Sequence, residues 1–159
     1  MDTSFIDAKG TRLAVSEMIG EILGFMNMSQ DARYKVIIGS DSEARESDEI
    51  DFATAIVVHR IGNGGRYFWR RREFKRFHTL RDRIIQEVVL SIETAKEILL
   101  ALETFNAPAF DFEIHVDIGE NGATKAMMQE VLGMVRAYNF EARTKPESYA
   151  ASKVADRHV

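Results

Sequence analysis

The chain has 159 residues, of which 45% are hydrophobic and 29% charged, a composition typical of a globular protein with one full-sized core. No apolar run approaches the ~20 residues needed to cross a bilayer, and the start MDTSFIDAKG lacks the features of a signal peptide, so we expect no membrane partner. The absence of cysteine excludes disulfides and thiolate metal sites, and it is consistent with the reducing cytoplasm where we expect the protein to be located.

Hydrophobic periodicity predicts an α/β protein. In chain order, the expected elements are a helix over 12–28, strands over 35–40, 52–61 and 66–74, a helix over 80–105, a strand over 110–118, a helix over 123–138, a strand over 140–144 and a helix over 147–157. The polar segment 42–49 is expected to be a loop. A hairpin followed by alternating helices and strands is typical of a mixed sheet, here of five strands with flanking helices. We expect one domain over 1–159, with 1–30 as an N-terminal helical extension.

Residues 66–83, RYFWRRREFKRFHTLRDR, form a basic block rich in aromatic side chains. Eight Lys and Arg residues and two acidic residues give the block a charge of +6 within a chain of net charge −4. Such a block favours an anionic partner at one place on the surface. The alternative is a hairpin strand with solvated arginines, followed by the start of a helix.

Three acidic residues stand where an isolated charge is unfavourable. Asp41 follows the apolar run VIIGS, Asp117 follows FEIHV, and Glu87 lies on the core-facing stripe of the 80–105 helix. A charge held against a core costs several kcal/mol unless it is paired or bound to a metal. If the strands carrying Asp41 and Asp117 are neighbours, the three carboxylates converge and predict an oxygen-only site for Mg²⁺ or Mn²⁺.

A fourth acid, Asp156, follows in ASKVADRHV, where small alanines allow the last helix to pack closely. Each acid also has a simpler interpretation. Asp41 and Asp117 are then turn or helix-capping residues, and Glu87 and Asp156 are paired with arginine. The four acids together are less easily explained in this way.

The segments GSDSE, GNGG, IHVDIGENG and KPESYAASKVADR resemble a family of uncharacterised bacterial proteins grouped as ribonuclease H-like, from about Tyr34 onward. The order of elements likewise resembles the ribonuclease H-like fold. By this resemblance, Asp41 matches the aspartate of the first strand and Glu87 the glutamate of the first sheet-packed helix. Asp117 matches the aspartate of the fourth strand, and Asp156 that of the last helix.

The resemblance implies a metal-dependent nuclease or phosphodiester hydrolase that uses two Mg²⁺ or Mn²⁺ ions about 3.5–4 Å apart. Asp41 is expected to bridge the ions, Glu87 and Asp117 to hold one, and Asp156 the other. The expected phosphate contacts are Arg70, Arg72, Lys75, Arg76, Lys145 and Lys153.

Aromatic and histidine side chains have two interpretations each. Tyr67 and Trp69 either stack on bases or pack inside the protein. His115 shares a strand face with Asp117 and either supports a metal ligand or is a satisfied core histidine. His158 either assists proton transfer beside the last acid or belongs to an unstructured tail.

Two other functions compete with hydrolysis. One is a non-catalytic module that binds nucleic acid or protein through the basic block, and the other is a regulatory metal-binding dimer. The sequence does not distinguish RNA, DNA and hybrid substrates, or endonuclease from exonuclease action. It also does not indicate the oligomeric state.

Overall fold

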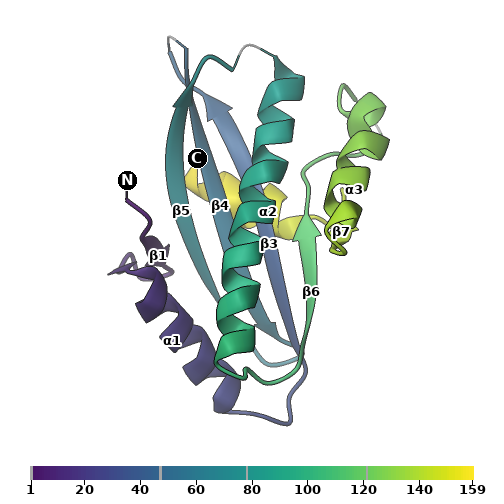
Figure 1. The fold of residues 1–159 in the computed structure, drawn as a ribbon. Helices are drawn as coiled ribbons and strands as arrows, with labels where there is room; N and C mark the ends of the chain where they lie inside the picture. The colour runs from purple at the N-terminus through teal and green to yellow at the C-terminus, as the bar shows by residue number, and fades with distance from the viewer. Residues whose placement is uncertain (1, 47, 78, 121) are drawn as a thin grey trace.

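A seven-stranded sheet with the strand order β2-β1-β5-β4-β3-β6-β7 forms the centre of the fold (Figure 1). The computed structural model describes residues 2–46, 48–77, 79–120 and 122–159. The strands are β1 (Phe5–Asp7), β2 (Arg12–Leu13), β3 (Tyr34–Ala44), β4 (Glu49–Arg60), β5 (Gly65–Lys75), β6 (Phe110–His115) and β7 (Glu141–Arg143). The helices are α1 (Val15–Asn27), α2 (Leu80–Thr104) and α3 (Met128–Ala137), with a 3₁₀ turn (Lys125–Met127) before α3.

The α/β class and the mixed sheet are confirmed, but the sheet has seven strands rather than the predicted five. The extra strands are β1 and β2, which are three and two residues long. Strands this short do not display the alternation by which a sequence predicts a strand. They pair with each other and attach to β5 through Ile6 and Asp7, so the N-terminal extension is not helical throughout.

Strands β3 and β6 are adjacent and parallel, as predicted, with Val36 opposite Phe112 and Ile38 opposite Ile114. Strand β3 is longer than predicted. Its polar end pairs with β4 as far as Ala44, so part of the expected 42–49 loop is strand. Asp41 therefore lies within β3, opposite Ala53, and not at the strand end. Pairing on β4 supplies the backbone hydrogen bonds of this segment whatever its side-chain polarity.

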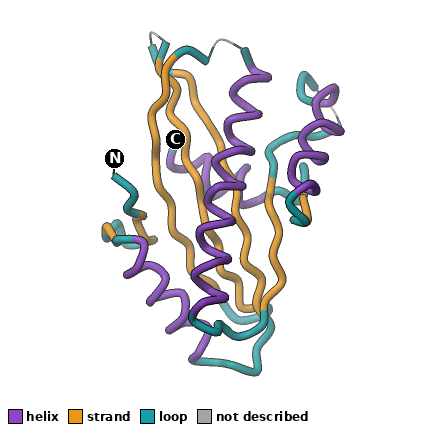
Figure 2. Tube along the Cα trace, viewed as in Figure 1, coloured by secondary structure: helices purple, strands orange, loops and turns teal. Residues whose placement is uncertain are grey.

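The two faces of the sheet are covered by different parts of the chain (Figures 1 and 2). Helix α2 crosses one face, which we call the α2 face, and Thr79 caps it by accepting a hydrogen bond from the Asp82 N–H at 3.0 Å. The last predicted helix is instead a π-helical turn (Ala150–Ala155) followed by a 3₁₀ turn (Asp156–His158). This C-terminal segment packs on the other face, which we call the C-terminal face.

Alternation along the strands assigns each side chain to one face. Val36, Ile38 and Ser40 of β3 lie on the α2 face, and Val36 and Ile38 belong to the main hydrophobic cluster. Asp41 lies on the C-terminal face. No helix in the described part of the chain is long and apolar enough to cross a membrane.

Candidate metal and phosphate site

Asp41 and Asp156 meet on the C-terminal face of the sheet. The carboxyl group of Asp41 shares a hydrogen bond with that of Asp156 in the C-terminal segment. Beside Asp41, Ala53 and Ala55 of β4 are buried against Ala155, so small side chains allow this segment to lie close to the sheet. The structure therefore brings together the first and the last of the four predicted acids.

Asp117 lies just beyond the end of β6, the parallel neighbour of β3. Its Oδ1 is 3.4 Å from Lys145 Nζ, and its charge acts on Asp41. Gly119 favours the close approach of Lys145, because a Cβ atom at Gly119 would meet the Lys145 Cβ at 3.2 Å, a tight contact. The third acid is thus close to the Asp41–Asp156 pair and is bound to a cation of the protein.

Glu87 approaches from the α2 face. It is only 7% exposed, and the Ser42 Oγ donates a 2.5 Å hydrogen bond to Glu87 Oε2. Arg83, one turn earlier on α2, donates from Nε to Ser42 Oγ at 3.2 Å and from Nη2 to the Ser42 carbonyl at 2.9 Å. Because Ser42 directly follows Asp41, strand β3 separates Glu87 from Asp41, although their charges still interact.

Two of the four acids resist ionisation. Burial foremost, then the hydrogen bond with Asp156 and the charge of Asp117, raises the pKa of Asp41 to about 7, against a hydrogen bond from the Ser42 backbone N–H. Burial foremost raises the pKa of Glu87 to about 8, with the charges of Asp41 and Asp117 adding to it and the hydrogen bond from Ser42 opposing it. Near pH 7, much of the negative charge expected from the sequence is therefore absent.

The donor atoms suit Mg²⁺ or Mn²⁺, which prefer carboxylate oxygens, but the side chains do not form a complete site. In the described part of the chain, no group of three or more His, Asp or Glu residues could hold a metal ion. Asp41 and Asp156 hydrogen-bond to each other and Asp117 contacts Lys145. A proton and an ammonium group thus occupy oxygens that a cation would need.

A line of polar contacts continues from Glu87 along the interface between α2 and the sheet. Ser91 Oγ on α2 is 2.7 Å from Ser40 Oγ, which is 2.9 Å from Thr54 Oγ1 on β4. One turn further, Thr94 Oγ1 accepts a 3.1 Å hydrogen bond from Arg70 Nη2. We call these contacts the α2 polar line. They satisfy polar groups that would otherwise be buried without partners.

The basic block is divided between the two faces of β5 and the turn that follows it. Arg70 is 6% exposed, lies over the Phe5 ring and has its Nη2 3.5 Å from Glu97 Oε2. This position favours a role in packing α2 over a role in holding phosphates. Arg72 is half-buried, and its Nε has no hydrogen-bond partner in the described structure.

The other expected phosphate contacts are accessible. Lys75 and Arg76 are exposed at the end of β5, and Lys75 Nζ is 3.8 Å from Glu49 Oε1. Lys145 keeps 54% of its side chain exposed beside Asp117, and Lys153 is exposed on the C-terminal segment. Lys145 thus lies beside Asp117, and Lys153 precedes Asp156 by three residues in the C-terminal segment.

Trp69 is covered by the chain itself. Its ring stacks on the His158 ring, with the ring centroids 4.0 Å apart and an interplanar angle of 7°. The centroid of the Tyr67 ring lies 5.9 Å from that of the His158 ring. Arg71 donates two hydrogen bonds, from Nε at 3.0 Å and from Nη2 at 2.7 Å, to the His158 carbonyl. The tail interpretation of His158 does not fit these contacts, while its part in proton transfer stays a prediction.

His115 is a satisfied core histidine. It is 1% exposed, Nε2 lies 2.8 Å from Glu113 Oε1, and Nδ1 accepts a 3.1 Å hydrogen bond from the Ala150 backbone N–H. Because Nδ1 accepts, the neutral ring carries its proton on Nε2. Burial lowers the pKa of His115, which favours this neutral form. The side chain anchors the start of the C-terminal segment.

Sequence reasoning missed Ser42, Arg83 and Arg71 as parts of the site. Arg83 was detectable, because it lies four residues before Glu87 and so shares its helical face. Ser42 was hidden by the prediction that its segment is a loop. Nothing in the sequence indicated that Arg71 would hold a backbone carbonyl so distant along the chain.

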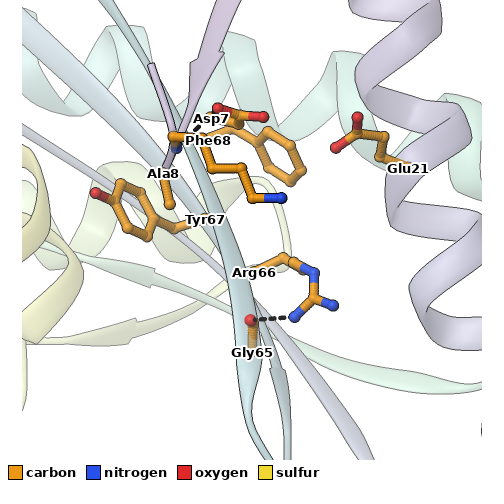
Figure 3. A pocket seen from close by; sticks show the side chains of 8 residues that line it. Asp7, Ala8, Glu21, Gly65, Arg66, Tyr67 and Phe68 are labelled. Atoms are coloured by element: carbon orange, nitrogen blue, oxygen red, sulfur yellow. Dashed lines mark hydrogen bonds between the residues drawn. The ribbon is translucent and has the colours of Figure 1, made fainter. Parts of the chain in front are cut away.

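Two cavities lie near these elements. One, of about 510 Å³, is lined by Gly119, Glu120, Thr144, Lys145 and Pro146, next to Asp117. The other, of about 570 Å³, lies between the N-terminal strands, α1 and β5, with none of the four acids in its lining. Figure 3 shows Glu21 of α1 and Arg66 of β5 at this second cavity, where Arg66 donates a 2.9 Å hydrogen bond to the Gly65 carbonyl.

A mixed sheet with a long helix on one face, and acids contributed by β3, α2, the end of β6 and the C-terminal segment, is the arrangement expected of ribonuclease H-like proteins. The family described as Ribonuclease H-like matches residues 17–159, and the chain belongs to this family. The chain is also 30% identical over 164 residues to the Bacillus subtilis (strain 168) protein called "Uncharacterized protein YkuK", with 96% of this chain and 95% of that protein covered. No solved structure gives a significant match.

Proposed function

We propose that the protein is a divalent-metal-dependent hydrolase that cleaves phosphodiester bonds in nucleic acid. The observation that carries the proposal is the carboxyl pair of Asp41 and Asp156, with Asp117 beside it at the end of the adjacent parallel strand. Membership of the ribonuclease H-like family supports this assignment of the acids. Fold alone does not define an activity, so the site residues carry the argument.

Asp41, Asp117 and Asp156 are the residues that would hold Mg²⁺ or Mn²⁺. Bound ions would activate water for attack on phosphorus and stabilise the departing oxygen. Loss of the proton shared by Asp41 and Asp156 makes both carboxylates available as ligands. A cation bound to Asp117 would compete with Lys145 for this carboxylate, and a displaced Lys145 would be free to contact a substrate phosphate.

Glu87 has a different part in this proposal. Its buried carboxyl group holds Ser42, and Ser42 fixes the backbone of β3 immediately after Asp41. Arg83 completes this contact by binding the Ser42 carbonyl. We therefore assign Glu87 to orienting Asp41 through Ser42, and its role as a metal ligand stays a prediction.

A non-catalytic binding module is the second candidate, and one observation favours it. The described residues contain no group of three acids or histidines placed to hold an ion, so the acids could serve packing alone. In that case, exposed cations such as Lys75 and Arg76 bind nucleic acid without cleaving it. The two candidates differ in their requirement for metal.

The test is cleavage of end-labelled RNA, DNA and RNA–DNA hybrid with Mn²⁺, with Mg²⁺ and with chelator alone. Asp117→Asn is purified in parallel, with Glu120→Gln as the matched control, because Glu120 is an exposed acid of the same loop. We expect metal-dependent cleavage by the wild type and the control and at least a 100-fold loss in Asp117→Asn. Cleavage that persists in Asp117→Asn contradicts the assignment of the site to these acids, whereas no cleavage together with metal-independent binding favours the module.

A further inference from the structure

The C-terminal segment that carries Asp156 has little means of holding its own position. It consists of a six-residue π-helical turn and a three-residue 3₁₀ turn. Helical pieces of this length are not stable by themselves, so contacts with the rest of the protein must fix them. Ala155 is buried against Ala53 and Ala55, but alanine supplies little apolar area.

The segment is fixed by polar and aromatic contacts at its two ends. At its start, the Ala150 N–H donates to His115 Nδ1. At its far end, His158 is held by Trp69 and Arg71 of β5, which we call the β5 clasp. Asp156 lies between these two anchors, and its carboxyl group reaches Asp41.

The β5 clasp makes two chemically independent contacts. Trp69 stacks on the His158 ring at 4.0 Å with an angle of 7°, a contact that needs the imidazole side chain. Arg71 donates through both Nε and Nη2 to the His158 backbone carbonyl, a contact that is independent of the side chain at position 158. One contact can therefore be removed while the other is kept.

We propose that Trp69 and Arg71 are positioning residues that deliver Asp156 to Asp41 by clasping His158, an inference that rests on the proposed metal site. Both side chains contact His158, and they act on Asp156 through it. The clasp sets where Asp156 lies, and so would set the affinity for a cation held by Asp41 and Asp156. By linkage, a cation bound to both carboxylates also strengthens the clasp by the same free energy.

The basic and aromatic row of β5 thereby takes on a function that differs from the one its sequence suggests. Trp69 and Arg71 bind the ring and the backbone carbonyl of His158 within the chain itself. Because Trp69 is the single tryptophan of the chain, its fluorescence reports directly on the clasp.

The experiment measures Mn²⁺ affinity by isothermal titration calorimetry at fixed pH for the wild type, Arg71→Ala, His158→Ala and His158→Phe. Lys75→Ala is the matched control, because it removes one positive charge from the same face of β5 without touching the segment. Asp156→Asn is the reference for loss of the ligand itself. Circular dichroism establishes that each variant is folded, and Trp69 emission is recorded with and without Mg²⁺.

We expect Arg71→Ala and His158→Ala to weaken Mn²⁺ binding roughly 10- to 100-fold, in the direction of Asp156→Asn, since residues that orient a ligand typically have effects of this size. His158→Phe keeps a ring on Trp69 and should restore most of the affinity, which a general loss of stability would not do. Mg²⁺ should shift Trp69 emission in the wild type and not in Asp156→Asn.

Two results overturn the inference in distinguishable ways. A wild type that binds no Mn²⁺ removes the proposed metal site, and the positioning role with it. The positioning role alone is overturned by a different result: the wild type binds Mn²⁺, Asp156→Asn does not, and the Mn²⁺ affinities of Arg71→Ala and His158→Ala both equal that of Lys75→Ala. If Arg71→Ala does not fold, the comparison of His158→Ala with His158→Phe decides.

Discussion

Asp41 and Glu87 lie on opposite faces of strand β3, joined through Ser42, which follows Asp41 in the chain and binds the Glu87 carboxyl group. The charges of Glu87 and Asp41 also interact across this strand. The site is assembled through the sheet and not within a single open cleft.

The buried carboxyl group of Glu87 makes the stability of the metal-free protein depend on pH. Its pKa is raised from 4.5 to about 8, so the folded state holds a proton that the unfolded state loses above about pH 4.5. The contribution of Glu87 to stability is then fully present below pH 4.5 and is lost as the pH rises through about 8. Glu87→Gln should raise the free energy of unfolding by a few kcal/mol at pH 8.5 and change it little at pH 5.

Urea unfolding of the wild type and Glu87→Gln at the two pH values measures this difference. Glu93→Gln is the control, because Glu93 is an exposed acid on the same helix. Equal effects of Glu87→Gln at both pH values would falsify the view that Glu87 is held in its protonated form.

If Asp41 is a metal ligand, Asp41→Asn should change stability in two different ways, one without metal and one with Mn²⁺ bound. Without metal, Asp41→Asn should be at least as stable as the wild type at pH 8, because it removes a carboxylate whose pKa burial and Asp156 raise to about 7. Mn²⁺ at about 100 times its Kd should stabilise the wild type by about 2.7 kcal/mol and the variant by much less.

Thermal melts with and without Mn²⁺ give the comparison, and Glu43→Gln, an exposed acid two residues along the same strand face, is the control. If Mn²⁺ raises the Tm of both proteins equally, or of neither, Asp41 does not bind the metal and the hydrolase proposal has to be abandoned.

Lys145 competes with a metal ion for Asp117. Its Nζ lies 3.4 Å from Asp117 Oδ1, so Lys145→Met should leave this carboxylate available to bind a metal ion. The ion pair contributes roughly 1 kcal/mol, so its loss should tighten Mn²⁺ binding by about 3- to 10-fold. The same substitution should weaken binding of nucleic acid if Lys145 contacts phosphate. Calorimetry with Mn²⁺ and fluorescence anisotropy with a labelled oligonucleotide follow the two effects separately. Lys125→Met is the control, because it removes the same charge at another position. An unchanged Mn²⁺ affinity in Lys145→Met would show that the ion pair between Lys145 and Asp117 does not weaken metal binding.

The basic block should divide into a structural part and a binding part. Arg70→Met removes the buried contacts with Thr94 and Glu97 and should lower the free energy of unfolding by about 1–3 kcal/mol, with little effect on nucleic-acid affinity. Arg76→Ala should do the reverse, because Arg76 is exposed: stability within about 0.5 kcal/mol of the wild type and a salt dependence of binding reduced by about one charge. Urea unfolding and anisotropy at several salt concentrations test both variants. Weakened binding in Arg70→Met at unchanged stability would contradict this division.

The sequence predicted the parts of the fold that are long and periodic. The adjacency of β3 and β6 followed from two apolar strands and the order of elements, and it is present in the structure. Strands β1 and β2 were not predicted, because they have too few residues to show a hydrophobic period. The polar end of β3 was not predicted as a strand, because its strand structure comes from pairing with β4 and not from a pattern in its own side chains.

The candidate site was predictable as a set of residue types and not as an arrangement. The sequence predicted that Asp41, Glu87 and Asp117 converge, and the resemblance to the family added Asp156. In the structure, the charge of Asp117 and the hydrogen bond of Asp156 act on Asp41. The sequence could not indicate that Lys145 would contact Asp117 or that Trp69 would stack on His158. Both contacts join segments far apart in sequence, and they follow from the packing of the C-terminal segment, whose irregular helical form leaves no periodic signal.

The α2 polar line also determines which position α2 can take on the sheet. Apolar side chains tolerate sliding and rotation, since many packings of similar volume have similar energy. Hydroxyl and carboxyl groups do not: a shift of α2 by one turn would separate Glu87 from Ser42, Ser91 from Ser40 and Thr94 from Arg70 at once. Each separated pair would leave buried groups without partners, at a cost of about 1–3 kcal/mol per group. The line thus discriminates against neighbouring placements of the longest helix. It does so with the same side chain, Glu87, whose charge interacts with Asp41 and Asp117 across β3.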